Sequence, residues 1–229
     1  GGKQMKINHR ITKLICAVAI MATASSANSQ SNAETKKTYL RVDAGYSYVP
    51  KKINSNYGKK PKGAFLGAVG AGYILNSKFK TDFTINYRGD YKYSYTTKPS
   101  NYSETQKFSS VAFMCNGYFA PSIKTFKRAT PYLMAGAGLA INKANNLNTR
   151  SGTAHILGSQ KRNFAWQLGV GTLIKLKNNL SADLMYKYVD LGKVTTKKVG
   201  VEGEALTFVG PAKGTLKAHE VSLGLNFKF

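Results

Sequence analysis

Residues 217–229 read KAHEVSLGLNFKF and alternate between apolar and polar positions. Polar residues or glycine separate the apolar positions, which are Val221, Leu223, Leu225, Phe227 and Phe229. Successive side chains of a β-strand point to opposite faces, so the pattern predicts a strand with one apolar and one hydrated face. The apolar face of such a strand needs either a protein core or a membrane beside it.

The composition suits strands and turns better than helices. The chain has 229 residues, of which 42% are apolar, and this is enough for one domain of ordinary size. It includes 22 glycines and 14 tyrosines. Only 19% of residues are charged, yet the formal net charge is +24. The lysines cluster outside the alternating segments, without a zinc-ligand set, a basic helix or an RNA-binding motif. We therefore expect no nucleic-acid partner.

The first 27 residues have the features of an export signal. After residues 1–4, which we interpret as an upstream remnant, a basic segment begins at Met5, an apolar run covers residues 14–22, and small residues follow. Cleavage after Ala24 or Ala27 fits this pattern, and the run is shorter than the roughly 20 residues of a spanning helix. A short buried helix is the less suitable alternative. We expect a polar lead-in at residues 28–36 and a barrel domain at residues 37–229.

The cysteines favour neither a disulfide framework nor a metal site. Cys16 lies in the predicted signal, which leaves Cys115 alone in the rest of the chain. The remaining chain has no run of about 20 apolar residues, so it predicts no transmembrane helix. If this chain spans a membrane, it must do so as a closed barrel.

Eight segments of about 11 to 13 residues alternate in this way, a length that crosses a bilayer when the strands are tilted. They are residues 39–49, 63–75, 79–89, 108–120, 131–142, 163–175, 180–191 and 217–229. Long and short connections join them in turn, as in outer-membrane proteins with long extracellular loops and short periplasmic turns. The sequence therefore predicts an all-β fold, an eight-stranded antiparallel up-and-down transmembrane β-barrel.

The polar faces of these segments carry charges of nearly balanced sign. They belong to Arg41, Asp43, Lys80, Asp82, Arg88, Asp183, Lys187 and Glu220. A soluble barrel would turn its apolar face inward, but balanced charges and glycines suit a narrow interior. Eight strands leave an interior that side chains fill, so we expect ion pairs within the lumen. A small porin with a selective conduit, or a purely structural barrel, remains the alternative.

Three segments resemble a known family. LSADLMYKYVDLG (180–192), TPYLMAGAGLA (130–140) and HEVSLGLNFKF (219–229) are similar to the opacity-type surface antigens, small outer-membrane barrels related to the transmembrane part of OmpA. The resemblance covers residues 39–229, and we expect no peptidoglycan-binding domain after the last strand. It implies localisation in the bacterial outer membrane, with Phe227 and Phe229 as the signal read by the barrel-assembly machinery. The family includes adhesins and invasins, among them small rickettsial adhesins that bind host serum proteins, and it implies neither catalytic residues nor a cofactor.

The long connections carry the candidate binding residues. Their lysines are Lys51, Lys52, Lys59, Lys60, Lys62, Lys193, Lys197, Lys198 and Lys213. Such loops attract anions, so the expected partners are lipopolysaccharide phosphates, sulfated glycans or acidic patches on host surface or serum proteins. The alternative is that these lysines only solvate the loops or neutralise the cell's own lipopolysaccharide.

A run of tyrosines, Tyr91, Tyr93 and Tyr95, continues the odd-numbered apolar face of residues 79–89. It predicts an aromatic girdle, or an anchor for a partner if the strand projects beyond the bilayer.

A lipid A-modifying enzyme is the remaining alternative. It would need a hydroxyl, a base and a carboxylate within hydrogen-bond reach. His219 and Asp190 are predicted on one face near the outer rim, but Ser222 points inward and Thr215 lies in a loop. We therefore expect no enzymatic activity and no metal.

Overall fold

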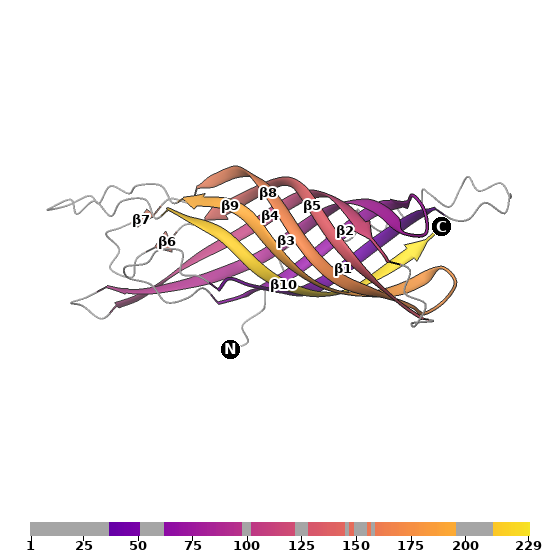
Figure 1. The fold of residues 1–229 in the computed structure, drawn as a ribbon. Coiled ribbons are helices and arrows are strands. Elements are labelled where there is room, and N and C mark those ends of the chain that lie inside the picture. The colour runs from indigo at the N-terminus through magenta and orange to yellow at the C-terminus, as the bar shows by residue number, and fades with distance from the viewer. Residues whose placement is uncertain are drawn as a thin grey trace, which may run out of the picture. The chain divides into compact units, whose positions relative to one another are not determined.

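Eight antiparallel strands close into a barrel in the computed structural model (Figure 1). The structure describes residues 37–50, 62–97, 102–121, 128–144, 147–148, 155–156, 159–195 and 213–229. The barrel strands are β1 (Thr38–Tyr48), β2 (Ala64–Ile74), β3 (Phe79–Thr97), β4 (Tyr102–Phe119), β5 (Ala129–Ala144), β8 (Gln160–Lys175), β9 (Leu180–Thr195) and β10 (Lys213–Lys228). Two short strands, β6 (Leu147–Asn148) and β7 (His155–Ile156), pair with each other in a separate sheet. The described residues include no helix that is long and apolar enough to cross a membrane.

The first and last strands of the barrel pair with each other. Their register runs from Tyr39↔Lys228 to Tyr48↔His219 without a break. Two hydrogen bonds tie the ends together: the Phe229 amide donates to the Thr38 carbonyl at 3.2 Å, and the Thr38 hydroxyl donates to the Phe229 carbonyl at 2.9 Å. Because the ring is closed, no strand edge is left for the membrane to cover. Residues 217–229 are thus confirmed as part of the closing strand.

The hairpin of β3 and β4 is longer than the sequence predicted. Pairing continues from Tyr91↔Phe108 to Thr97↔Tyr102, which confirms that the strand projects beyond residue 89, whereas a loop that continues to about residue 107 is wrong. Tyrosine and threonine in this stretch suit cross-strand pairing, and such pairs let a ribbon continue past the apolar band.

A bulge in β3 inverts the faces of the residues that follow it. Arg88 pairs with Ser110, but Tyr91 pairs with Phe108, so β3 carries one extra residue at this point. One extra residue moves the following side chains to the opposite face. Tyr91 is therefore wholly buried inside the barrel, with its hydroxyl 2.6 Å from Ser47 Oγ. The prediction that Tyr91 continues the outer aromatic face is wrong.

A second irregularity lies between β9 and β10. Thr215 pairs with Lys193 but Lys217 pairs with Asp190, so β9 holds the extra residue. Gly192 lies in this bulge with φ of +74°, a backbone conformation that glycine adopts without steric cost. Beyond it, Lys193 is exposed and Val194 is buried.

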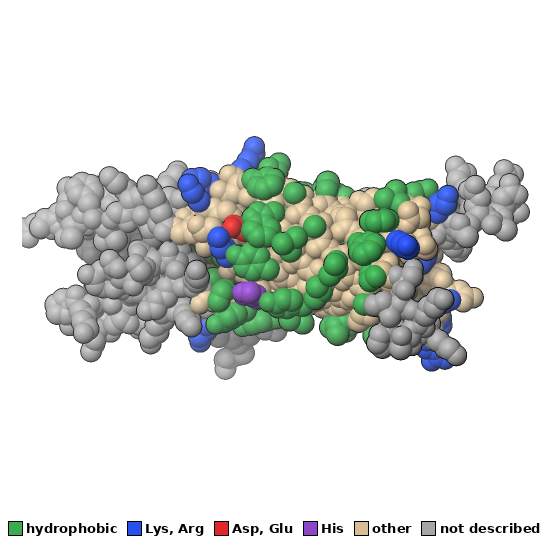
Figure 2. Space-filling model, in the orientation of Figure 1, with side chains coloured by type: hydrophobic (Ala, Val, Ile, Leu, Met, Phe, Trp, Pro, Cys, Tyr) green, Lys and Arg blue, Asp and Glu red, His purple; other side chains and the backbone are tan. Residues whose placement is uncertain are grey.

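The outer surface of the barrel is apolar and the interior is polar. Large side chains such as Leu223 (62% exposed) and Leu139 (60%) face outward, whereas the charged Arg88 and Glu220 are buried. Figure 2 shows hydrophobic side chains along the middle of the barrel and Lys and Arg side chains toward its ends. This distribution is the reverse of that of a soluble barrel. Within the apolar band, it confirms the prediction that the apolar face of each strand points outward and the polar face points into the lumen.

The bulge can be tested by cysteine labelling in a Cys115→Ala background. We expect Lys92→Cys to react with a water-soluble maleimide on intact cells, because Lys92 is exposed beyond the bulge, on the side of the long connections. Tyr91→Cys should stay unlabelled until the protein is unfolded, because residue 91 faces the lumen. The reverse pattern would show that β3 runs through this region without a bulge.

Candidate functional site

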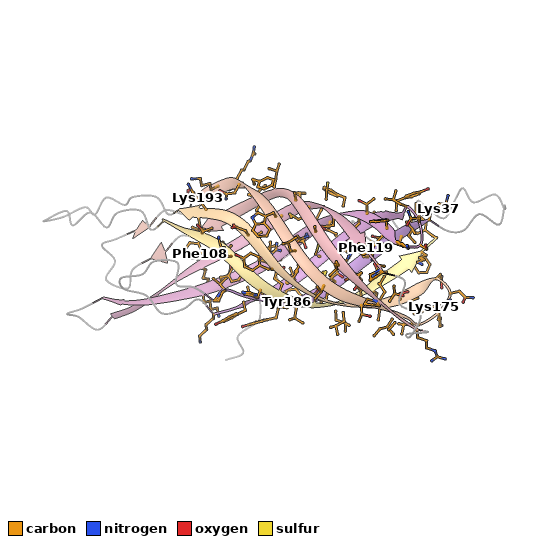
Figure 3. The ribbon with its side chains drawn as sticks, viewed as in Figure 1. Lys37, Phe108, Phe119, Lys175, Tyr186 and Lys193 are labelled. Carbon is orange, nitrogen blue, oxygen red and sulfur yellow. The ribbon has the colours of Figure 1, made fainter. Side chains whose placement is uncertain are left out.

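The two ends of the barrel differ in their connections. Both termini of the barrel and the short turns near Asn76 and Asn178 lie at one end, where Figure 3 labels Lys37 and Lys175. The long connections lie at the opposite end, where Figure 3 labels Lys193. We call these the short-turn end and the long-connection end.

A cluster of buried charges crosses the lumen nearer the short-turn end. The guanidinium of Arg41 makes two hydrogen bonds to Asp43, at 2.8 and 2.9 Å, and lies 3.2 Å from Asp82 and 3.4 Å from Asp183. Arg41 and Asp43 are two residues apart on β1, so they share its inner face, while the other carboxylates come from β3 and β9. The Arg41 cluster therefore joins strands from opposite sides of the barrel.

Tyrosine hydroxyls supply further donors to the same carboxylates. Tyr39 and Tyr118 donate to Asp82 at 3.1 and 2.8 Å, and Tyr132 donates to Asp183 at 2.6 Å. Buried carboxylates need such donors to offset the loss of their hydration. These tyrosines were not among the predicted site residues, although each has the parity of an inner-face position.

Lys80 lies at the edge of the Arg41 cluster and interacts differently from the prediction. Its ammonium lies 4.3 Å from the ring centroid of Tyr118, 5.0 Å from that of Tyr132 and 5.3 Å from that of Tyr39. Among the described residues, no carboxylate lies within ion-pair distance of Lys80. Cation–π contacts thus take the place of the expected ion pair.

A second cluster occupies the lumen nearer the long-connection end. Glu220 accepts hydrogen bonds from Arg88 at 2.6 and 3.0 Å, and it lies 3.4 Å from the ammonium of Lys187. Ser47 donates to the same carboxylate at 2.7 Å, and Lys187 donates to Asn86 at 3.2 Å. The four strands that contribute to this Glu220 cluster are β1, β3, β9 and β10, so it spans the seam where the barrel closes.

The two clusters fill the interior rather than line a wide channel. Arg41, Arg88, Met114 and Gln167 are among the largest fully buried side chains. An eight-stranded barrel has room only for such side chains. The arrangement serves as a set of cross-barrel braces.

The residues considered for lipid chemistry are engaged elsewhere. His219 Nδ1 lies 2.6 Å from the Tyr186 hydroxyl, and the imidazole packs against the ring of Tyr188. Asp190 accepts a hydrogen bond from the Gly192 amide and pairs with Lys217 at 3.2 Å. Within the described residues, no group of three or more potential ligands is placed to hold a metal ion.

Of the predicted basic residues, the structure places only some. Lys51, Lys52, Lys59, Lys60, Lys197 and Lys198 lie outside the described residues, as do the side chains of Tyr93, Tyr95 and Lys213. Lys62 forms a β-bridge with Lys92, where the Lys62 amide donates to the Lys92 carbonyl at 2.9 Å. Lys193 is exposed in β9.

Other exposed cations lie near Lys62 and Lys193 at the long-connection end. We define the basic rim as Lys62, Lys92, Lys107, Lys143, Lys161, Arg162, Lys193 and Lys217. Several of these lie in paired strand extensions, at positions where the sequence had predicted loops. Among the described residues, two acidic groups lie in the same region, Asp90 at 3.9 Å from Lys107 and Asp190 at 3.2 Å from Lys217.

Removing the carboxylate of the Glu220 cluster should destabilise the barrel strongly. We expect Glu220→Gln to lower the free energy of unfolding by about 3–5 kcal/mol, because it leaves Arg88 and Lys187 charged and buried. Urea unfolding in lipid bilayers measures this change. Asp190→Asn, which removes the charge that pairs with the exposed Lys217, is the control and should have a much smaller effect, because Lys217 can be hydrated when the pair is lost. A similar loss for the two variants would show that the Glu220 cluster is not a brace.

Comparison with known proteins agrees with this geometry. Residues 15–229 match the family model of the outer membrane protein beta-barrel domain. A candidate adhesin of Rickettsia conorii is 26% identical over 242 residues, and the match covers 93% of this chain and 90% of the adhesin. The Salmonella typhimurium outer membrane protein PagN is 26% identical over 182 residues, which cover 74% of this chain and 75% of its own.

The fold is shared with solved structures. The crystal structure of a major outer membrane protein from Thermus thermophilus superposes with a TM-score of 0.52 at 12% identity, covering 84% of this chain and 99% of its own. In such barrels the short turns face the periplasm and the long connections face outward. The family match spans most of the sequence, so the chain belongs to the outer membrane protein β-barrel family and lies in the bacterial outer membrane.

Proposed function

We propose that this protein is a surface adhesin whose basic rim binds sulfated glycans of a host surface. The observation that carries the proposal is the gathering of eight exposed cations at the long-connection end, where the described residues include two acidic side chains, Asp90 and Asp190. A surface of one charge sign raises the local concentration of oppositely charged partners and speeds their association. The name of the Rickettsia conorii relative, a candidate adhesin, supports the same role.

Three lysines of the rim form a row that suits a polyanion. Lys92 pairs directly with Lys107 across β3 and β4, and Lys62 is bridged to Lys92 on the other side. Directly paired residues hold their Cβ atoms about 4.5–5.5 Å apart, and like charges in that position repel. An anion between them relieves the repulsion, so a chain of closely spaced sulfate groups is a fitting ligand.

A purely structural role in the envelope is the second candidate. The buried Arg41 and Glu220 clusters favour it over a porin, because they occupy the lumen with paired charges. In that case the basic rim serves only to pair with the phosphates of the surrounding lipopolysaccharide.

Glycan binding can be measured on cells that display the protein. We expect Lys62→Gln, Lys92→Gln and Lys107→Gln together to weaken heparin binding by about tenfold, because exposed ion pairs contribute about 0.2–1 kcal/mol each. Binding by the unaltered protein should also fall when salt is raised well above physiological strength, which shortens the range of these charges.

The matched control neutralises Lys37, Lys175 and Lys177, which are exposed at the periplasmic end. This variant should bind heparin like the unaltered protein, because the glycan cannot cross the membrane. Heparin binding that survives the rim substitutions would contradict the proposal. Absence of binding to heparin and to host cells by the unaltered protein would leave the structural role.

A further inference from the structure

A pocket of about 320 Å³ opens at the periplasmic end of the barrel. Tyr39, Lys80 and Tyr132 lie along its inner part, and the turns near Asn76 and Asn178 contribute to its mouth. Its size lies at the lower end of the range for small-molecule sites. The pocket is at the opposite end from the basic rim, so no surface glycan reaches it.

The lining of this pocket has a strong bias of charge. It includes four lysines, Lys78, Lys80, Lys175 and Lys228, and no acidic side chain among the described residues that form it. Lys80 is the innermost of them, since it alone contacts the tyrosine rings of the lumen. These rings hold the ammonium in place, so it needs little reorganisation to bind an anion.

The hydrogen-bonding capacity of Lys80 is unused within the described part of the chain. The nearby carboxylates are already supplied with donors: Asp43 by Arg41, and Asp183 by Tyr132 and Asn226. Asp82 accepts from Asn116 and from two tyrosines. The ammonium of Lys80 has three donors, and no hydrogen bond from it is found among these residues. These donors are therefore available to an anionic group in the pocket.

We propose that the periplasmic pocket binds the phosphate group of a small molecule, with Lys80 contacting the phosphate. Lysine is well suited to phosphate as a compact charge, and Lys78, Lys175 and Lys228 at the mouth add to the attraction. The same chemistry occurs in a soluble periplasmic phosphate ester and in the glycerol phosphate headgroup of an inner-leaflet lipid. This site is independent of the proposed adhesin function.

Calorimetric titration of the folded protein in phosphatidylcholine nanodiscs tests the site, with glycerol 3-phosphate as the probe. We expect saturable binding, and no heat from glycerol, which lacks the phosphate. Lys80→Met should weaken binding by at least about tenfold, since a hydrogen bond to a charged group accounts for about that much. Lys175→Gln, at the mouth, should weaken it by a smaller factor.

Lys177→Gln is the matched control, because Lys177 is exposed at the same end but does not line the pocket. Heat-modifiable gel migration verifies that each variant folds, and Lys80→Gln replaces Lys80→Met if the latter does not. Weaker binding of the probe in nanodiscs of phosphatidylglycerol than in phosphatidylcholine nanodiscs made equally anionic with oleate would identify the lipid headgroup as the occupant, whereas equal binding in the two would identify a soluble ester. Absence of saturable binding, or equal binding by the Lys80 and Lys177 variants, would overturn the proposal.

Discussion

The structure depends on the pairing of β1 with β10. Without this seam, two strands would present unpaired amide and carbonyl groups to lipid, at a cost of several kcal/mol for each group. Ten consecutive residues of β1 are in register with β10, from Tyr39 to Tyr48, and Thr38 bonds to Phe229 beyond them. The closing strand must face lipid on one side and the lumen on the other. Barrel closure therefore explains why apolar and polar residues alternate in residues 217–229.

Closure also determines what the interior contains. The inner faces converge on a narrow space, so large polar side chains there must satisfy one another. Arg41, Asp43 and Asp82 do so nearer the periplasm, and Arg88, Lys187 and Glu220 do so nearer the outer surface. Buried ion pairs add little net stability compared with apolar packing, but each is costly to break. Because side chains occupy the lumen, both proposed binding sites lie at the ends of the barrel, the basic rim at the outer end and the lysine-lined pocket at the periplasmic end.

Most of the fold could be predicted from the sequence, because period-two alternation survives wherever one face meets lipid. It located the eight strands and the inward direction of Arg41, Asp82 and Glu220. It failed at Tyr91, because strict alternation was assumed to continue past Arg88, and the alternation does not reveal the bulge at this point. It also failed to find the partners of Lys80, since ring contacts from three strands depend on the curvature of the closed sheet. The candidate binding lysines at Lys51 and Lys197 stay predictions, because they lie outside the described residues.

Disulfide cross-linking across the seam tests the central claim most directly. In a Cys115→Ala background, Ala44→Cys and Leu223→Cys place two outward-facing thiols directly opposite each other. We expect mild oxidation of the folded protein to join them within one chain. Ala44→Cys with Phe227→Cys, four residues out of register, should not cross-link, because cysteines whose Cα atoms lie more than about 7 Å apart cannot be bridged without backbone movement. Equal cross-linking of both pairs, or of neither, would contradict a barrel closed in this register.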